Sequence, residues 1–133
     1  MNAVEVVKAL NKAPYFTALN VNPDCYGMLS GLREAILKRD PNELHLLNKE
    51  NVTGLWAILP YEDDDNPHIV LRTNIPLHTH ERMRLVAEIF DYFPHDIPYD
   101  YETHIVNTQD EYLCMDILGG RARTVYDKER EKA

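Results

Sequence analysis

The chain has 133 residues, of which 44% are hydrophobic and 27% charged, so its composition is that of a globular domain and not of a disordered chain. Its formal net charge of −8 disfavours direct binding to nucleic acid, because phosphate recognition needs a basic surface. No apolar run approaches the roughly 20 residues that cross a bilayer, and the N-terminal sequence lacks a signal-peptide pattern. We therefore expect a single cytoplasmic domain over 1–133 that does not insert into membranes.

The N-terminal third of the chain predicts helices. Residues 3–12 show an amphipathic pattern. The sequence Asn22-Pro23-Asp24 combines a capping side chain, a proline and an acid, and it predicts a helix over about 23–39. Asp40-Pro41 repeats this signal and predicts a short third helix that ends near Asn48. The apolar faces expected for the first two helices consist of Ala3, Val6, Val7 and Leu10, and of Cys25, Leu29, Leu32 and Ile36.

The central part of the chain predicts a β-hairpin followed by a helix. Residues 52–59 and 68–74 are apolar runs of strand length, and the acidic turn between them favours a hairpin. Thr79 can cap the next helix, which we expect over about 80–92. The core stripe expected for this helix is Met83, Val86, Phe90 and Phe93, broadened by Leu85 and Ile89.

The C-terminal part predicts a second hairpin. Pairing Asn107 with Glu111 separates polar from apolar side chains on the two faces of strands 100–107 and 111–118. Beyond Gly119-Gly120 we expect residues 121–133 to be a frayed helix or a disordered tail. The sequence therefore predicts an α+β fold, with N-terminal helices followed by a β-hairpin, a helix and a β-hairpin, and with a mainly antiparallel sheet.

The negative charge is concentrated in one segment, which we call the acidic segment, residues 85–120. It contains eight acids and no lysine or arginine, while the remaining fourteen acids and all fourteen bases balance elsewhere in the chain. A basic protein surface or a cation is the expected partner of such a segment.

The connection at 91–104, DYFPHDIPYDYETH, combines carboxylates with tyrosine rings. Pro94 and Pro98 prevent a regular helix or inner strand, so we expect a surface loop with at least one exposed tyrosine. Tyrosine is favoured at interfaces, and acids steer a basic partner. The sequence thus predicts a non-catalytic binding module, such as an inhibitor, immunity or accessory protein, with a purely solubilising role of the acids as the alternative. The expected contact residues are Asp91, Tyr92, Asp96, Tyr99, Asp100, Tyr101 and Glu102.

An enzyme is the second hypothesis. The predicted hairpin places Glu102 opposite Asp116, and His104 opposite Cys114, on one face. Such a cluster resembles a divalent-metal site or a Cys–His nucleophile pair with acidic support. A solvated sheet face is the simpler explanation of the same residues. The sequence contains no nucleotide-binding or nucleophile-elbow motif, so we expect no cofactor.

Three smaller features are also expected from the sequence. His78, His80, Arg82 and Arg84 flank a helix N-terminus where a phosphate or carboxylate can bind, although a water-exposed cap explains them as well. DNA mimicry by the acidic segment requires the acidic turn, Glu62 to Asp65, on the same surface. The two cysteines, Cys25 and Cys114, form no CxxC pair, and we expect free thiols.

Overall fold

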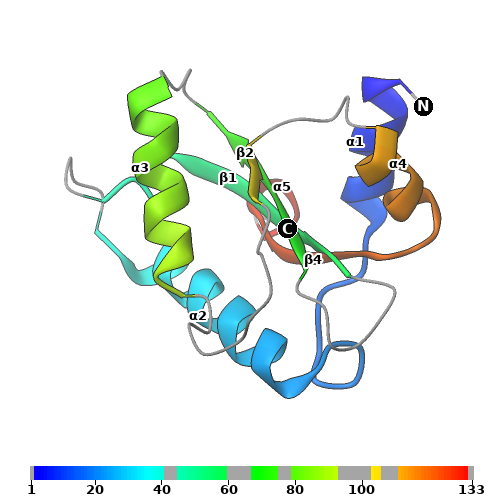
Figure 1. The fold of residues 1–133 in the computed structure, drawn as a ribbon, viewed down its shortest axis with the longest axis horizontal. Helices are drawn as coiled ribbons and strands as arrows, with labels where there is room; N and C mark the ends of the chain where they lie inside the picture. Colours follow the sequence, from blue (N-terminus) through cyan, green and yellow to red (C-terminus); the bar gives the residue numbers. More distant parts are fainter. Residues whose placement is uncertain are drawn as a thin grey trace.

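The computed structural model describes residues 2–40, 45–59, 67–74, 79–92, 103–105 and 111–131. Within these residues the chain forms an α+β fold, as expected (Figure 1). The helices are α1 (Ala3–Lys12), α2 (Pro23–Lys38), α3 (Thr79–Phe90), α4 (Glu111–Leu118) and α5 (Lys128–Glu131). The strands are β1 (Val52–Ile58), β2 (His68–Thr73), β3 (Thr103–Ile105) and β4 (Ala122–Asp127). No helix of the described residues is both long and apolar enough to cross a membrane.

The strands form one sheet in the order β3-β2-β1-β4. Strand β1 pairs antiparallel with β2 and with β4, whereas β3 runs parallel to β2. The predicted hairpin of β1 and β2 and the mainly antiparallel sheet are both confirmed. Helix α3 makes the crossover that a parallel connection from β2 to β3 requires.

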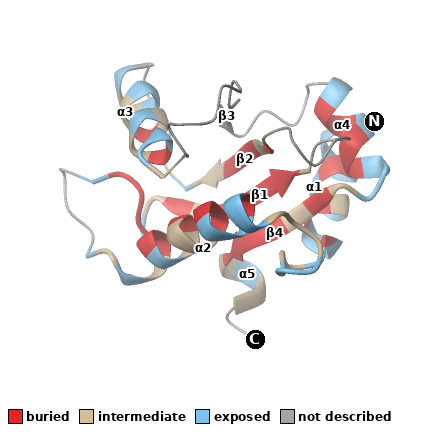
Figure 2. Cartoon of the chain, turned by 60° about the horizontal axis from the view of Figure 1, so that its bottom comes forward, coloured by how far each residue is buried: buried red, intermediate tan, exposed pale blue. Residues whose placement is uncertain are grey.

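Helices cover both faces of this sheet (Figure 1). On one face α2 and α3 enclose a core that includes Leu32 and Leu55. On the other face α1 and α4 enclose a second core that includes Leu10, Trp56 and Ile117. Leu55 and Trp56 belong to different cores because successive side chains of a strand point to opposite faces. Burial on both faces makes β1 and β4 more enclosed than β2 (Figure 2).

Local capping fixes the starts of the first two helices. The Asn2 side chain accepts a hydrogen bond from the N–H of Glu5 at 2.9 Å, and the Asn2 backbone N–H donates to the Glu5 carboxylate, which completes a capping box. The Asn22 side chain accepts from the N–H of Cys25 at 2.8 Å, and Pro23 occupies the first position of α2. The predicted bounds of both helices are therefore confirmed.

Trp56 anchors α1 on the sheet. Its indole Nε1 donates to the carbonyl oxygen of Leu10 at 3.1 Å, and its ring lies over Gly54, two residues away on the same face of β1. The guanidinium of Arg72 covers the ring at 5.1 Å from the ring centroid. Arg72 also pairs with the buried carboxylate of Asp127 at 2.9 Å. Trp56 and Arg72 together therefore link α1, β1, β2 and β4.

Two of the predicted elements are wrong. Residues 111–118 form helix α4 and not the second strand of a hairpin, so Glu111 is not the strand residue that was predicted to pair with Asn107, which lies outside the described residues. Residues 122–127, predicted as part of a tail, form β4, which pairs with β1. Within the predicted strand 100–107, the described residues form β3. This strand pairs with β2 and not with residues 111–118.

The predicted third helix is also wrong at residues 45–48, which are not helical; residues 41–44 lie outside the described part. Side chains here accept hydrogen bonds from backbone N–H groups. The carboxylate of Glu88 accepts from the N–H of Leu46 at 2.7 Å, and the Asn48 side chain accepts from the N–H groups of Glu50 and Asn51.

Helix α3 buries only part of the predicted stripe, namely the two residues that were expected to broaden it. Leu85 and Ile89 are completely buried, whereas Met83 is 67% exposed and Phe90 is also exposed. The next residue on the buried side is Tyr92, whose ring lies 3.1 Å from where a Cβ at Gly31 of α2 would be. The absence of a side chain at Gly31 therefore lets the Tyr92 ring approach α2 closely.

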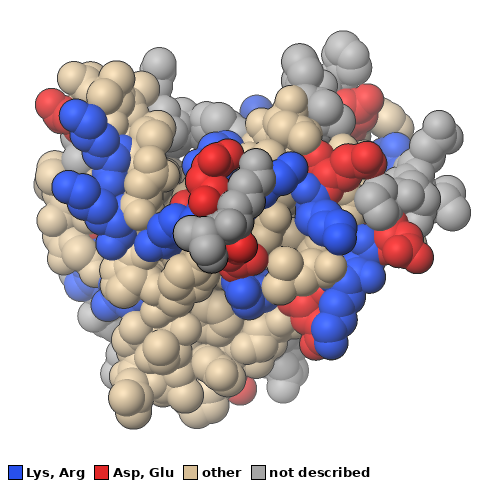
Figure 3. Space-filling model, turned by 180° about the vertical axis from the view of Figure 1, so that it is seen from behind, with Lys and Arg blue, Asp and Glu red and all other residues tan. Residues whose placement is uncertain are grey.

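Charged side chains of both signs alternate on the face seen from behind (Figure 3). The C-terminal residues also pair with other elements: Glu131 with Arg33 of α2, and Asp127 of β4 with Arg72 of β2 and Arg130 of α5. These pairs hold the end of the chain on α2 and the sheet.

Candidate functional site

The acidic segment does not form one continuous surface in the described residues. The side chain of Glu88 is mostly buried and pairs with Arg39 at 3.1 Å and with His45 at 3.4 Å. Asp91 is exposed at the end of α3, and Asp116 is buried in α4 on the other face of the sheet. Two of these acids are thus largely removed from solvent, and one is exposed.

The predicted contact residues that the structure describes also differ in their exposure to solvent. The Tyr92 hydroxyl accepts a hydrogen bond from Arg39 at 3.0 Å, and its ring packs against the α2–α3 core. Tyr92 therefore joins helices, while Asp91 remains exposed. The other predicted contact residues, Asp96, Tyr99, Asp100, Tyr101 and Glu102, lie outside the described residues.

Helix α4 presents an apolar face to solvent within the acidic segment. Tyr112 is 54% exposed, and Met115 and Leu118 are each 66% exposed. Their spacing of three residues places them on one stripe of the helix. Leu113 and Ile117, on the opposite side, are buried against α1 and the sheet. The outer stripe, which we call the α4 face (Tyr112, Met115 and Leu118), is exposed among the described residues, and the Tyr112 ring also contacts the ring of His68 at a centroid distance of 5.7 Å.

The cross-strand cluster proposed for an enzyme is not formed as predicted. Cys114 and Asp116 lie on α4, where residues two apart diverge, and no hairpin sets them opposite His104 and Glu102. The side chain of His104 and the whole of Glu102 lie outside the described part. Among the described residues, no group of three or more potential ligands is arranged to hold a metal ion. Both cysteines are free and buried, which confirms that expectation.

The predicted anion site at the start of α3 is described in part. His80 and Arg82 are exposed, Arg84 is half-buried, and His78 lies outside the described residues. The DNA-mimic alternative depends on the acidic turn from Glu62 to Asp65, which also lies outside the described residues. Both remain predictions.

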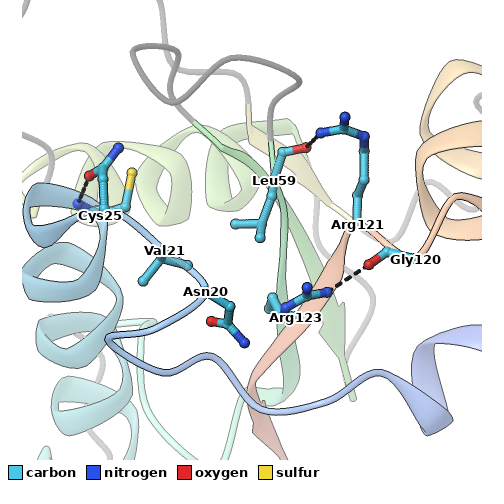
Figure 4. A pocket seen from close by; sticks show the side chains of 8 residues that line it. Asn20, Val21, Cys25, Leu59, Gly120, Arg121 and Arg123 are labelled. Atoms are coloured by element: carbon cyan, nitrogen blue, oxygen red, sulfur yellow. Dashed lines mark hydrogen bonds between the residues drawn. The ribbon is translucent and has the colours of Figure 1, made fainter.

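A cavity of about 170 Å³ lies between the start of α2 and the start of β4 (Figure 4). The described residues that line it are Asn20, Val21, Asn22, Cys25, Leu59, Gly120, Arg121 and Arg123. Gly120 ends the turn after α4 with a φ of +78°, a conformation that glycine adopts without strain. This turn directs the chain into β4 and brings both arginines to the wall of the cavity.

Sequence reasoning missed this cavity because its walls are about a hundred residues apart in the chain. One signal was present: Arg121 and Arg123 alternate with Ala122 as they do in a strand with one apolar face. Comparisons with protein-family models, with curated proteins and with solved structures found no match to this chain.

Proposed function

We propose that the protein is a non-catalytic, cytoplasmic binding module that engages a basic protein through the acidic segment, with the α4 face as its apolar anchor. The observation that supports the proposal is the exposure of Tyr112, Met115 and Leu118 on a helix that carries no lysine or arginine. Exposed apolar patches rimmed by polar residues commonly mark protein interaction sites.

The residue types of the α4 face suit an interface. Tyrosine and methionine are enriched in interface cores, where they bury large areas, and methionine adapts its shape to a partner. The acids of the segment would steer a basic partner and set its orientation, while the apolar side chains would supply most of the affinity. Asp96, Asp100 and Glu102 belong to this proposal as steering residues.

Site-specific photo-crosslinking tests the proposal. A benzophenone amino acid at position 115 should capture a basic protein in the producing cells, and the same group at position 19 should not. Leu19 is the matched control, because it is 98% exposed and lies outside the acidic segment, between α1 and α2. Purification of the captured protein then allows its affinity to be measured directly.

With the purified partner, Met115→Lys should weaken binding at least about tenfold, as expected for an anchor residue, whereas Leu19→Lys should leave it unchanged. Reversal of Asp96, Asp100 and Glu102 to lysine should slow association and reduce the salt dependence of binding. Because Met115 is exposed, Met115→Lys should change the free energy of unfolding by no more than about 0.5 kcal/mol. Equal capture from positions 19 and 115, or capture of an acidic partner, would contradict the proposal.

A further inference from the structure

The cavity between α2 and β4 is lined by hydrogen-bond donors that are oriented by the backbone. Arg121 Nη1 donates to the carbonyl oxygen of Leu59 at 3.1 Å, and Arg123 Nη1 donates to that of Gly120 at 2.7 Å. Figure 4 shows Arg123 extending from β4 toward Asn20, with Val21 and Cys25 on the α2 side. The two guanidinium groups are therefore held at one wall of the cavity by bonds to main-chain oxygens.

Arg123 keeps donor capacity for a further acceptor. A guanidinium carries five N–H donors, and the hydrogen bonds of Arg123 to described residues use Nη1 only, toward the carbonyl oxygens of Gly120 and Ala122. Its Nε is buried and has no hydrogen-bond partner among the described residues. Its Nη2 makes no hydrogen bond to a described residue, so the two N–H groups of Nη2 can donate to an acceptor that enters the cavity.

Asn20 supplies a second oriented donor. Its Oδ1 accepts from the N–H of Thr17 at 2.8 Å, which fixes the side-chain amide and leaves its two N–H donors for other acceptors. The cavity wall thus combines a planar guanidinium with an amide, both of which bind the oxygens of carboxylates and phosphates.

The charges around the cavity favour an anion. None of the described residues that line it is acidic, and two are arginines. Burial raises the pKa of the Cys25 thiol above its usual 9.0, so the sulfur carries no negative charge at neutral pH. The opposing charge is that of Asp24, an exposed acid in the first turn of α2 whose field reaches Cys25.

We propose that this cavity binds a small oxyanion, a phosphate or carboxylate group, through Arg123 with support from Arg121 and Asn20. Its volume of about 170 Å³ is close to that of engineered cavities, of about 150 Å³, that hold one benzene molecule, so a ligand of five or six heavy atoms fits. The site is distinct from the α4 face and does not depend on the proposed protein-binding function.

An NMR titration of the full chain with inorganic phosphate, and separately with acetate, tests the proposal at neutral pH and constant ionic strength. Saturable shifts of the backbone amides of Asn20, Gly120 and Arg123 are expected. The phosphate and acetate arms show whether a tetrahedral or a planar oxyanion is preferred, and saturation by either one supports the site. Arg123→Lys should weaken binding at least about tenfold, because lysine keeps the charge but loses the planar fork.

Two further variants keep the test decisive if Arg123→Lys does not fold. Asp24→Asn removes the opposing charge without removing a donor and should strengthen binding about two- to threefold. Arg82→Gln, at the exposed start of α3, should have no effect. The proposal is overturned if neither anion saturates, if Asp24→Asn leaves affinity unchanged, or if the shifts centre on His80 and Arg82, which would assign the anion to the α3 N-terminus.

Discussion

Gly54 of β1 is expected to tolerate no side chain, because the Trp56 ring occupies the place of a Cβ. A Cβ at position 54 would lie 2.3 Å from Cη2 and 2.5 Å from Cζ3 of Trp56, and 3.3 Å from Cζ of Arg72. The ring has little freedom to move aside. It is 1% exposed, its Nε1 is bonded to the oxygen of Leu10, and Arg72 covers it.

Gly54→Ala should therefore destabilise the protein by about 2–3 kcal/mol. Overpacking of a well-ordered core costs about 1–3 kcal/mol, and displacement of the ring would weaken the hydrogen bond to Leu10, worth about 1 kcal/mol. The intrinsic preference acts in the opposite direction, since alanine is favoured over glycine inside a strand by about 0.5–1 kcal/mol. For a chain of this length the net effect corresponds to a fall in Tm of roughly 10 °C.

Chemical denaturation followed by circular dichroism and by the fluorescence of the single tryptophan measures this effect. Gly27→Ala is the matched control, because a Cβ at that helical position has nothing within 4 Å and should stabilise the protein by about 0.5–1 kcal/mol. Trp56→Phe removes the ring atoms that clash, so Gly54→Ala should cost much less in that background. A loss below about 1 kcal/mol for Gly54→Ala, or the same loss in both backgrounds, would refute the proposed contact.

Three further outcomes are expected. Gly31→Ala should destabilise the protein by about 1 kcal/mol despite the gain in helix propensity, because the new Cβ meets the Tyr92 ring at 3.1 Å; calorimetry beside Gly27→Ala gives the comparison. Asp127→Asn should cost about 3 kcal/mol in urea denaturation, because it leaves Arg72 without its buried carboxylate partner. Burial raises the pKa of Tyr126 above its usual 10.0, so the folded state retains a proton that the unfolded chain releases just above pH 10. Stability should fall as the pH rises through that window, and Tyr126→Phe should reduce the slope in pH-dependent thermal melts.

Elements defined by local chemistry were predictable from the sequence. The starts of α1 and α2 depend on side chains three residues from the N–H groups that they cap, and both were located correctly. The hairpin of β1 and β2 follows from two apolar runs separated by a polar turn. The third predicted helix failed because Glu88, about forty residues away, binds the N–H of Leu46, and no local pattern contains that contact.

The C-terminal region failed for a physical reason that periodicity does not resolve. An apolar run of eight residues fits either a buried strand or a short helix. As a strand, 111–118 would place Leu113, Met115 and Ile117 on one face; as a helix it buries Leu113 and Ile117 and exposes Met115. The charged residues of β4 resemble a solvated tail in sequence, but Asp127 is buried because Arg72 of β2 pairs with it. The identity of that strand is therefore set by a partner elsewhere in the sheet.

Both candidate sites depend on the turn that joins α4 to β4. The N–H groups of Gly119, Gly120 and Arg121 donate to the carbonyl oxygens of Met115, Ile117 and Asp116, which ends the helix and reverses the chain. Gly120 has a φ of +78°, and a Cβ there would meet nothing within 4 Å, so the cost of a side chain is conformational and not steric.

Gly120→Ala should accordingly lose about 1–2 kcal/mol of stability. It should also weaken oxyanion binding, because the bond from Arg123 to the carbonyl oxygen of Gly120 orients the guanidinium. Gly120→Asn should recover part of both losses, since asparagine tolerates positive φ better than alanine does. Gly119→Ala is the control, because its Cβ would make only ordinary contacts of 3.5 and 3.6 Å. Equal losses of stability from Gly119→Ala and Gly120→Ala, measured in parallel urea titrations, would show that the turn does not require positive φ at position 120.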